Sequence, residues 1–191
     1  MSMGNKKKLL ILILVFVLLM VGAYVLYDRL DDGLAPEQLQ TQPQESTEST
    51  EQPLQVPDFT VFDAEGNAVK LSSYIGKPVV LNFWASWCGP CQSEMPDFQE
   101  KYEQLGDEIQ FLMVNMTTGR ETLDGAKKFI AEKGYTFPVF FDTKEQAAIA
   151  YRVYSLPTTF FIDAEGNFVT YQPGMLSAQT LQKGIDLLLA Q

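Results

Sequence analysis

The most informative segment of the sequence is Val79-Val-Leu-Asn-Phe-Trp-Ala-Ser-Trp-Cys-Gly-Pro-Cys91. Its first six residues are apolar apart from Asn82, and so continuous an apolar run predicts a strand buried on both faces. Pro90 suits the first turn of a helix, where no backbone N–H is needed for the intrahelical ladder. The stretch therefore predicts a buried strand, a short loop, and a helix from Pro90 to about Leu105.

The two cysteines of this stretch carry its chemistry. Cys88 lies where a helix begins, and the unpaired N–H groups of the first turn favour negative charge there. A thiolate at such a position is a nucleophile. Cys91 follows one turn behind, within reach of Cys88 but less open to solvent. This order suits thiol–disulfide exchange: Cys88 attacks a substrate disulfide, and Cys91 then displaces the substrate from the mixed disulfide.

Other uses of the cysteine pair are less favoured by the sequence. Half of a zinc site would need two further ligands, and the chain has no histidine and no other cysteine. A purely structural disulfide closing so short a loop would contribute only about 2 kcal/mol. The glycines form no phosphate-binding loop. We therefore expect a redox-active pair, with no metal and no other cofactor.

On either side of this segment, strand-like and helix-like stretches of sequence alternate. The turn Asp63-Ala-Glu-Gly-Asn67 recurs almost unchanged as Asp163-Ala-Glu-Gly-Asn167, which predicts two similar hairpins. Alternation of strands with helices predicts an α/β fold with a central mixed sheet and helices on both faces. The further strands are expected over residues 59–62, 68–71, 109–115, 138–141, 158–162 and 168–171, and the further helices over 121–133, 144–151 and 177–189.

Composition narrows the possible functions. The chain has 191 residues, a net charge of −10 and an apolar fraction of 46%, enough for one ordinary domain with accessory segments. The absence of histidine excludes a His-dependent triad and an imidazole metal site. A sequence pI near 4.4 argues against a nucleic-acid partner.

The N-terminal sequence predicts a membrane-targeting segment. Three lysines, the last being Lys8, precede an apolar run from Leu9 to Leu26. Residues 1–27 are expected to form a single-pass anchor with a cytoplasmic N-terminus. The alternative is a secretory signal cleaved after Ala23. Either reading places the domain outside the cytoplasm. Residues 28–53 are rich in acidic and polar side chains and predict a flexible linker, followed by the domain over 54–191.

Two motifs resemble the thioredoxin superfamily. Trp84-Ala-Ser-Trp-Cys-Gly-Pro-Cys91 is similar to its active-site motif, and Ser155-Leu-Pro-Thr158 is similar to its loop with a cis-proline. The N-terminal anchor, the early hairpin and the extra element over 118–141 make the chain similar to membrane-anchored extracytoplasmic reductases of the ResA/TlpA type. The resemblance implies a thioredoxin-like fold with an N-terminal β-hairpin and a cis Leu156–Pro157 bond.

The resemblance also suggests roles for individual residues. Glu94 matches a glutamate that ResA-like proteins use for proton handling, while Asn82 stands where thioredoxins have a buried aspartate. Glu94 could instead simply favour the early turns of its helix. Substrate contacts are implied for the residues around the disulfide and the proline loop, namely Trp87, Gly89, Pro90, Leu156 and Pro157. The reactive group is the Cys88–Cys91 disulfide itself.

The sequence therefore predicts a membrane-tethered thiol-disulfide oxidoreductase that reduces protein disulfides outside the cytoplasm. The resemblance implies a transmembrane thiol carrier of the CcdA type as electron donor. It implies apocytochrome c, or another extracytoplasmic protein such as methionine sulfoxide reductase, as acceptor. Two alternatives remain open: an oxidase or isomerase acting on secreted proteins, and a non-catalytic docking module with a structural disulfide.

Overall fold

The computed structural model describes residues 16–21 and 54–191. The chain divides into two units, Met1–Gln38 and Leu39–Gln191. Residues 16–21 are helical, and no helix of the described residues has both the length and the apolar character to cross a membrane. Apart from 16–21, the predicted anchor over 1–27 and linker over 28–53 lie outside the described residues.

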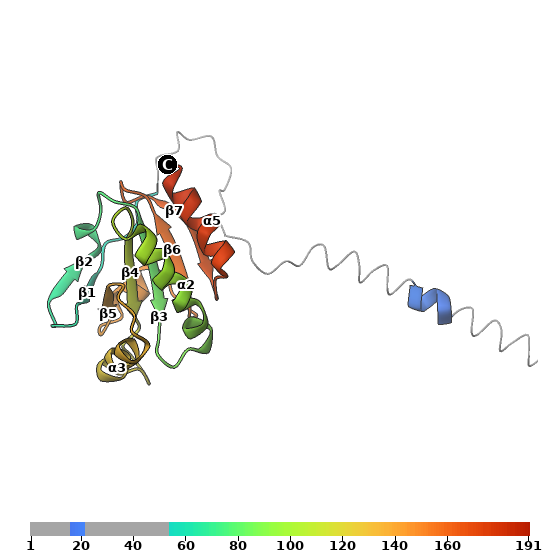
Figure 1. Ribbon diagram of the computed structural model, residues 1–191, viewed down its shortest axis with the longest axis horizontal. Helices are drawn as coiled ribbons and strands as arrows, with labels where there is room; N and C mark the ends of the chain where they lie inside the picture. The colour runs from blue at the N-terminus through green and yellow to red at the C-terminus, as the bar shows by residue number, and fades with distance from the viewer. Residues whose placement is uncertain (1–15, 22–53) are drawn as a thin grey trace, which may run out of the picture. The chain divides into compact units, whose positions relative to one another are not determined.

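A seven-stranded mixed sheet organises the second unit (Figure 1). The strands are β1 Thr60–Phe62, β2 Ala68–Lys70, β3 Val79–Trp84, β4 Gln110–Asn115, β5 Val139–Phe141, β6 Thr158–Ile162 and β7 Phe168–Pro173. They lie in the order β2-β1-β5-β4-β3-β6-β7. β3 and β5 pair in parallel with β4, while β6 and β7 form an antiparallel hairpin. The N-terminal hairpin β1–β2 joins through an antiparallel bridge to β5.

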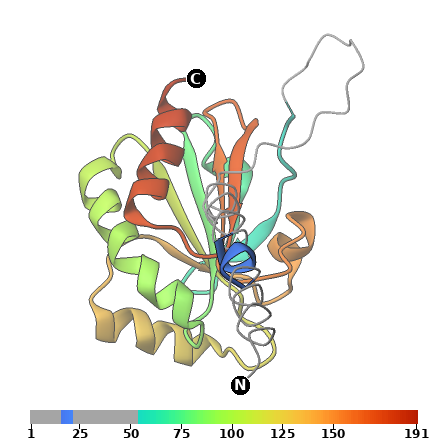
Figure 2. The same ribbon diagram turned by 90° about the vertical axis from the view of Figure 1, so that its right-hand side faces the viewer.

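Helices cover both faces of this sheet (Figure 2). They are α2 Gly89–Leu105, α3 Leu123–Lys133, α4 Gln146–Ala150 and α5 Ala178–Leu189, with the short 3-10 helix η1 over Leu71–Ser73. The face with α2, α3 and α5 buries Val80 and Trp84 of β3. The opposite face, with α4 and η1, buries Leu81 and Phe83 of the same strand. Because alternate strand residues point to opposite faces, this one central strand contributes to both cores.

The two predicted hairpin turns have the same hydrogen bonds. Asp63 Oδ1 accepts from the backbone N–H of Glu65 at 3.0 Å and of Asn67 at 2.8 Å. Asp163 Oδ1 accepts from the corresponding N–H groups at 3.0 Å and 2.7 Å. In both turns the asparagine side chain donates to Oδ2 at 2.9 Å. The repeated sequence therefore encodes one turn structure twice, because all of its bonds close within five residues.

The last helix packs unusually closely on the sheet. α5 begins after Ser177, whose hydroxyl accepts from the Thr180 N–H at 3.2 Å, as expected of an N-cap. Gly184 of α5 faces Phe161 of β6, and a Cβ atom at that position would come within 2.2 Å of the phenyl ring. Glycine at this position therefore allows α5 to lie directly on the ring.

Two helices are shorter than predicted. α3 begins at Leu123 rather than 121, because the Thr122 hydroxyl caps it by accepting from the Gly125 N–H at 3.0 Å. α4 covers Gln146–Ala150 rather than 144–151. The Asp142 carboxylate accepts from the backbone N–H of Gln146 and of Ala148, each at 2.9 Å, and so organises the start of this helix from outside it.

Candidate active site

The disulfide lies at the N-terminus of α2, one short loop beyond the end of β3. Cys88 is the N-cap residue of α2 and is bonded to Cys91. Its Sγ accepts from the Cys91 N–H at 3.2 Å, so the helix start already directs a donor at this sulfur. Gly89 and Pro90 form the first turn between them. Cys88 keeps 4% of its surface exposed and Cys91 none, which makes Cys88 the sulfur that a partner reaches first.

The cis-proline loop lies at the same edge of the sheet. The Leu156–Pro157 bond is cis, as the resemblance implied. β6 begins directly after it, and Thr158 is paired in the sheet with Phe83, next to the last residue of β3. The loop that precedes β6 and the loop that follows β3, which carries Cys88, therefore lie at the same end of the sheet.

Glu94 is buried one turn further along α2, with 1% of its surface exposed. Its Oε1 accepts from Asn82 Nδ2 at 2.9 Å, and its Oε2 accepts from the Leu176 N–H at 2.8 Å. Burial raises the pKa of Glu94 to about 7, against the opposing effect of these two hydrogen bonds. The carboxyl group can therefore both take up and release a proton near neutral pH, which an ordinary surface glutamate cannot do.

Asn82 can accommodate both protonation states of Glu94. In the structure its Nδ2 donates to Glu94 and to Thr159 Oγ1, each at 2.9 Å, as suits an ionised carboxylate. Its Oδ1 is buried and has no hydrogen-bond partner among residues 16–21 and 54–191. A half-turn of the amide would present Oδ1 to a protonated Glu94 and to the Thr159 hydroxyl, both of which can donate. The asparagine found in place of the thioredoxin aspartate thus supports a titrating group contributed by α2.

Sequence reasoning missed Glu121, which holds the loop before Cys88. This carboxylate is 5% exposed and accepts from both the backbone N–H and the hydroxyl of Ser86, the latter at 2.9 Å. Asn115 Nδ2 and the Thr122 N–H donate to it at 3.4 Å and 3.1 Å. The sequence placed Glu121 as the first residue of a helix. No local signal separates it from an ordinary N-terminal acid, because its main partner is 35 residues away.

The two tryptophans of the motif have different surroundings. Trp84 is fully buried, and its ring lies 5.8 Å from that of Phe129 on α3. Trp87 is 44% exposed, and the guanidinium carbon of Arg120 lies 3.7 Å from its ring centroid. Trp84 is therefore a core residue, whereas Trp87 offers an aromatic surface beside Cys88. Arg120, through Trp87, and Glu121, through Ser86, therefore hold the loop over residues 85–88 in place.

The site consists of protein side chains and a disulfide. Among residues 16–21 and 54–191, no three His, Cys, Asp or Glu side chains lie close enough together to hold a metal ion. A reactive disulfide at a helix N-terminus, a cis-proline loop and a buried carboxyl group titrating near pH 7 are suited to moving two electrons and two protons between thiols and disulfides.

Comparisons with known proteins agree with this chemistry. Residues 54–171 match the model of the AhpC/TSA family. The chain is 36% identical over 131 residues to the thiol-disulfide oxidoreductase ResA of Geobacillus kaustophilus, covering 68% of this chain and 74% of that protein. It is 33% identical over 142 residues to ResA of Bacillus subtilis, covering 74% and 78%. The exposed lipoprotein thioredoxin of Streptococcus pneumoniae superposes with a TM-score of 0.60 at 34% identity, covering 68% of this chain and 99% of that structure. The chain therefore belongs to the thioredoxin-like AhpC/TSA family and is a thiol-disulfide oxidoreductase of the ResA type.

Proposed function

We propose that this oxidoreductase works outside the cytoplasm, tethered to the membrane by its N-terminal segment, and that it reduces disulfides in other proteins. The observation that carries the proposal is the pairing of a barely exposed disulfide with a buried Glu94 whose pKa is raised to about 7 by burial. A reductase must supply protons to the thiolates that it releases, and a carboxyl group titrating near neutral pH is suited to that task.

The chemistry begins with the reduced protein. The Cys88 thiolate attacks one sulfur of the substrate disulfide, and the other substrate sulfur leaves as a thiolate. Cys91 then loses its proton and attacks Cys88, so that the Cys88–Cys91 disulfide forms and the second substrate thiolate leaves. Two electrons pass from the cysteine pair to the substrate. In this scheme Glu94 accepts the proton of the Cys91 thiol and passes it to a departing thiolate.

The proposal also includes partners on either side of this reaction. A transmembrane thiol carrier of the CcdA type would reduce the Cys88–Cys91 disulfide after each cycle. The acceptor would be the cysteine pair of apocytochrome c before haem attachment, or another extracytoplasmic protein. The exposed ring of Trp87 and the Leu156 backbone would contact that acceptor, with Gly89, Pro90 and Pro157 shaping the surface between them.

Trapping tests this proposal. In the Cys91→Ala variant the mixed disulfide at Cys88 cannot be resolved, so acceptor proteins should accumulate on it and be identifiable after non-reducing electrophoresis. The matched control is Cys88→Ala, which should trap little, because its remaining thiol is fully buried in the folded protein. Equal trapping by the two variants would contradict the assignment of Cys88 as the attacking thiol.

The reduction potential decides between the proposed reductase and the oxidase or isomerase alternative. A potential near that of thioredoxin, about −270 mV, supports a reductase, whereas a value near −120 mV is that of a strong oxidant. A disulfide that resists reduction by both small thiols and a protein donor would instead favour the non-catalytic alternative. Equilibration with glutathione of known redox ratio gives the value directly.

A further inference from the structure

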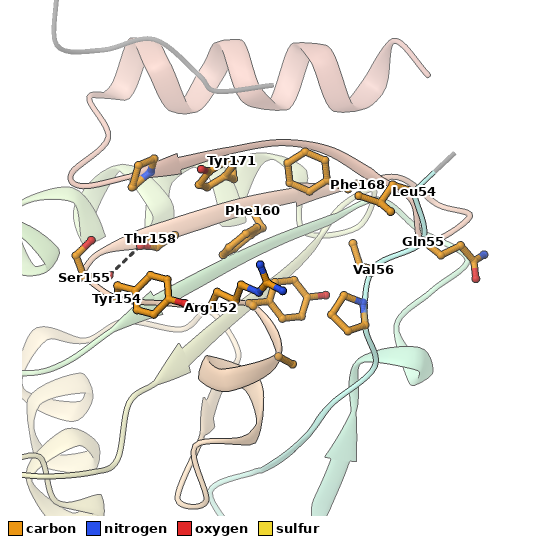
Figure 3. Close-up of a pocket in the computed structure, with 14 residues that line it drawn as sticks. Leu54, Gln55, Val56, Arg152, Tyr154, Ser155, Thr158, Phe160, Phe168 and Tyr171 are labelled. Atoms are coloured by element: carbon orange, nitrogen blue, oxygen red, sulfur yellow. Dashed lines mark hydrogen bonds between the residues drawn. The ribbon is translucent and has the colours of Figure 1, made fainter. Parts of the chain in front are cut away.

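A cavity of about 620 Å³ lies on the sheet face opposite α2 (Figure 3). It runs along β6 and β7, from Ser155 and Thr158 beside the cis-proline loop to Leu54 and Gln55 at the start of the described domain. Its volume is within the range of ligand-binding pockets, roughly 300–1,000 Å³. Neither the disulfide nor Glu94 lines it, so the redox chemistry described above does not account for it.

The floor of the cavity is aromatic and elongated. The rings of Phe160 and Tyr171 are stacked, with centroids 5.4 Å apart, and Tyr151 meets Phe160 edge-on at 4.9 Å. Along the β6–β7 hairpin the floor follows the pairs Thr158–Pro173 and Phe160–Tyr171 and ends at Phe168, which is paired with Ile162, four positions beyond Thr158. Four residue steps of strand span about 13 Å, the length of four or five residues of extended polypeptide.

A buried hydrogen-bond donor of the cavity is unused. Tyr151 lines it with 8% of its surface exposed, and its hydroxyl has no hydrogen-bond partner in the part of the chain that the structure describes. Burial and the nearby Asp58 carboxylate raise the pKa of Tyr151, which keeps the phenol protonated. Asp58 itself already accepts from the Ser72 hydroxyl at 2.9 Å and from two backbone N–H groups. An incoming carbonyl oxygen would therefore find a hydrogen-bond donor already in place.

The charge of the cavity is unusual for this chain. Among the described residues that line it, Arg152 is the one charged side chain, in a protein whose net charge is −10. This arginine is exposed, has a left-handed backbone with φ of 50°, and makes no ion pair with any described carboxylate. An aromatic groove with a single unpaired guanidinium favours a ligand that is mainly apolar and carries one negative charge.

We propose that this groove binds an extended segment of the protein substrate, with apolar side chains over the aromatic floor and an acidic residue at Arg152. A polypeptide is favoured because the groove begins at Ser155 and Thr158, which flank the Leu156–Pro157 bond. A chain paired with the Leu156 backbone therefore continues directly into it. This inference rests on the proposed function, the reduction of protein disulfides. It adds that the groove selects which proteins are substrates.

Peptide binding to the oxidised full-length protein tests the inference without any redox step. The probe is an acetylated, cysteine-free hexapeptide with three apolar side chains and one glutamate, and its match has lysine in place of glutamate. We expect calorimetry to show at least tenfold tighter binding of the acidic peptide. Arg152→Glu should abolish that preference, whereas Lys144→Glu, an equal charge change outside the cavity lining, should preserve it.

Tyr151→Phe tests the unused donor separately. The variant should melt at an unchanged or higher temperature, because it removes an unpaired buried hydroxyl, and it should bind the acidic peptide several-fold more weakly. A lowered melting temperature would show that the hydroxyl already has a partner, contrary to the inference. Two further results would overturn the inference. One is an equal loss of the preference for the acidic peptide in the Arg152 and Lys144 variants. The other is binding of decanoate, an apolar chain with one carboxylate, but of neither peptide.

Activity assays separate this inference from the proposed function. If the groove selects protein segments, Arg152→Glu should reduce a small-molecule disulfide as fast as the wild type while losing activity toward an acidic peptide disulfide. A wild-type protein that reduces disulfides but binds neither peptide would refute the groove alone. Peptide binding without any reductase activity would refute the proposed function and leave the groove intact.

Discussion

Replacing Glu94 by glutamine should change how the stability of the oxidised protein depends on pH. Burial raises the pKa of Glu94 from 4.5 to about 7 in the folded protein, while the unfolded chain keeps the ordinary value. Between these two values the folded state binds more protons than the unfolded state, so the free energy of unfolding falls as pH rises. At about 1.4 kcal/mol per pH unit the total loss is about 3 kcal/mol, and it is complete above about pH 7.

The glutamine variant keeps the shape of the site without this titration. Its amide oxygen can accept from the Leu176 N–H, and its amide nitrogen can donate to Asn82 once the Asn82 amide has turned to present Oδ1 in place of Nδ2. We therefore expect wild type and Glu94→Gln to have similar stability at pH 4.5. At pH 8 the variant should be the more stable of the two by up to about 3 kcal/mol.

Urea unfolding of the oxidised proteins between pH 4.5 and 8 measures this difference, because no thiol is present to titrate. Burial also raises the pKa of Asp142, but that contribution is common to both proteins and cancels in the comparison. Glu100→Gln, an exposed change on the same helix, should leave the pH profile of the wild type unaltered. A stability difference between wild type and Glu94→Gln that stays constant over this range would refute the reasoning. In the reduced proteins, the same substitution should slow disulfide reduction and alter the pH profile of Cys88 alkylation.

Three further predictions concern the thiols, the active-site loop and the packing of α5. Limiting alkylating reagent should label Cys88 in preference to Cys91 in the reduced protein, as read by peptide mapping; preferential labelling of Cys91 would reverse their roles. Glu121→Gln should lower the free energy of unfolding by about 1–3 kcal/mol and slow disulfide reduction, because it weakens charge-assisted bonds to the active-site loop. Its control is Glu132→Gln, in an exposed ion pair on α3, which should lower the free energy of unfolding in urea by less than about 1 kcal/mol. Equal losses of stability in the two variants would show that the bonds from Glu121 to the loop do not stabilise the protein more than a surface ion pair does. Gly184→Ala should destabilise the fold by about 1–3 kcal/mol, since the added methyl overlaps a phenyl ring; an unchanged melting temperature would mean that α5 shifts freely.

Much of the fold was readable from short stretches of sequence. The turns at Asp63 and Asp163 close their hydrogen bonds within five residues, so the repeated five-residue motif alone predicted two similar hairpins. The buried strand β3 and the helix beginning beside Cys88 were predicted nearly to the residue. The burial of Glu94, in contrast, depends on Leu176, 82 positions along the chain. The sequence could place Glu94 on the right helix but could not show that its carboxyl group is desolvated.

Local sequence is enough to predict the α/β architecture, the hairpin turns and the cysteine pair at a helix start, because periodicity, turn residues and helix caps act over a few residues. The side chains that surround this pair, in contrast, are set by tertiary packing. Glu121 reaches Ser86 across 35 positions, and Asn82 reaches Thr159 across 77. Such contacts exist because the sheet brings neighbouring strands, and the loops that connect them, side by side. No local pattern records which distant polar group will lie there when water is excluded.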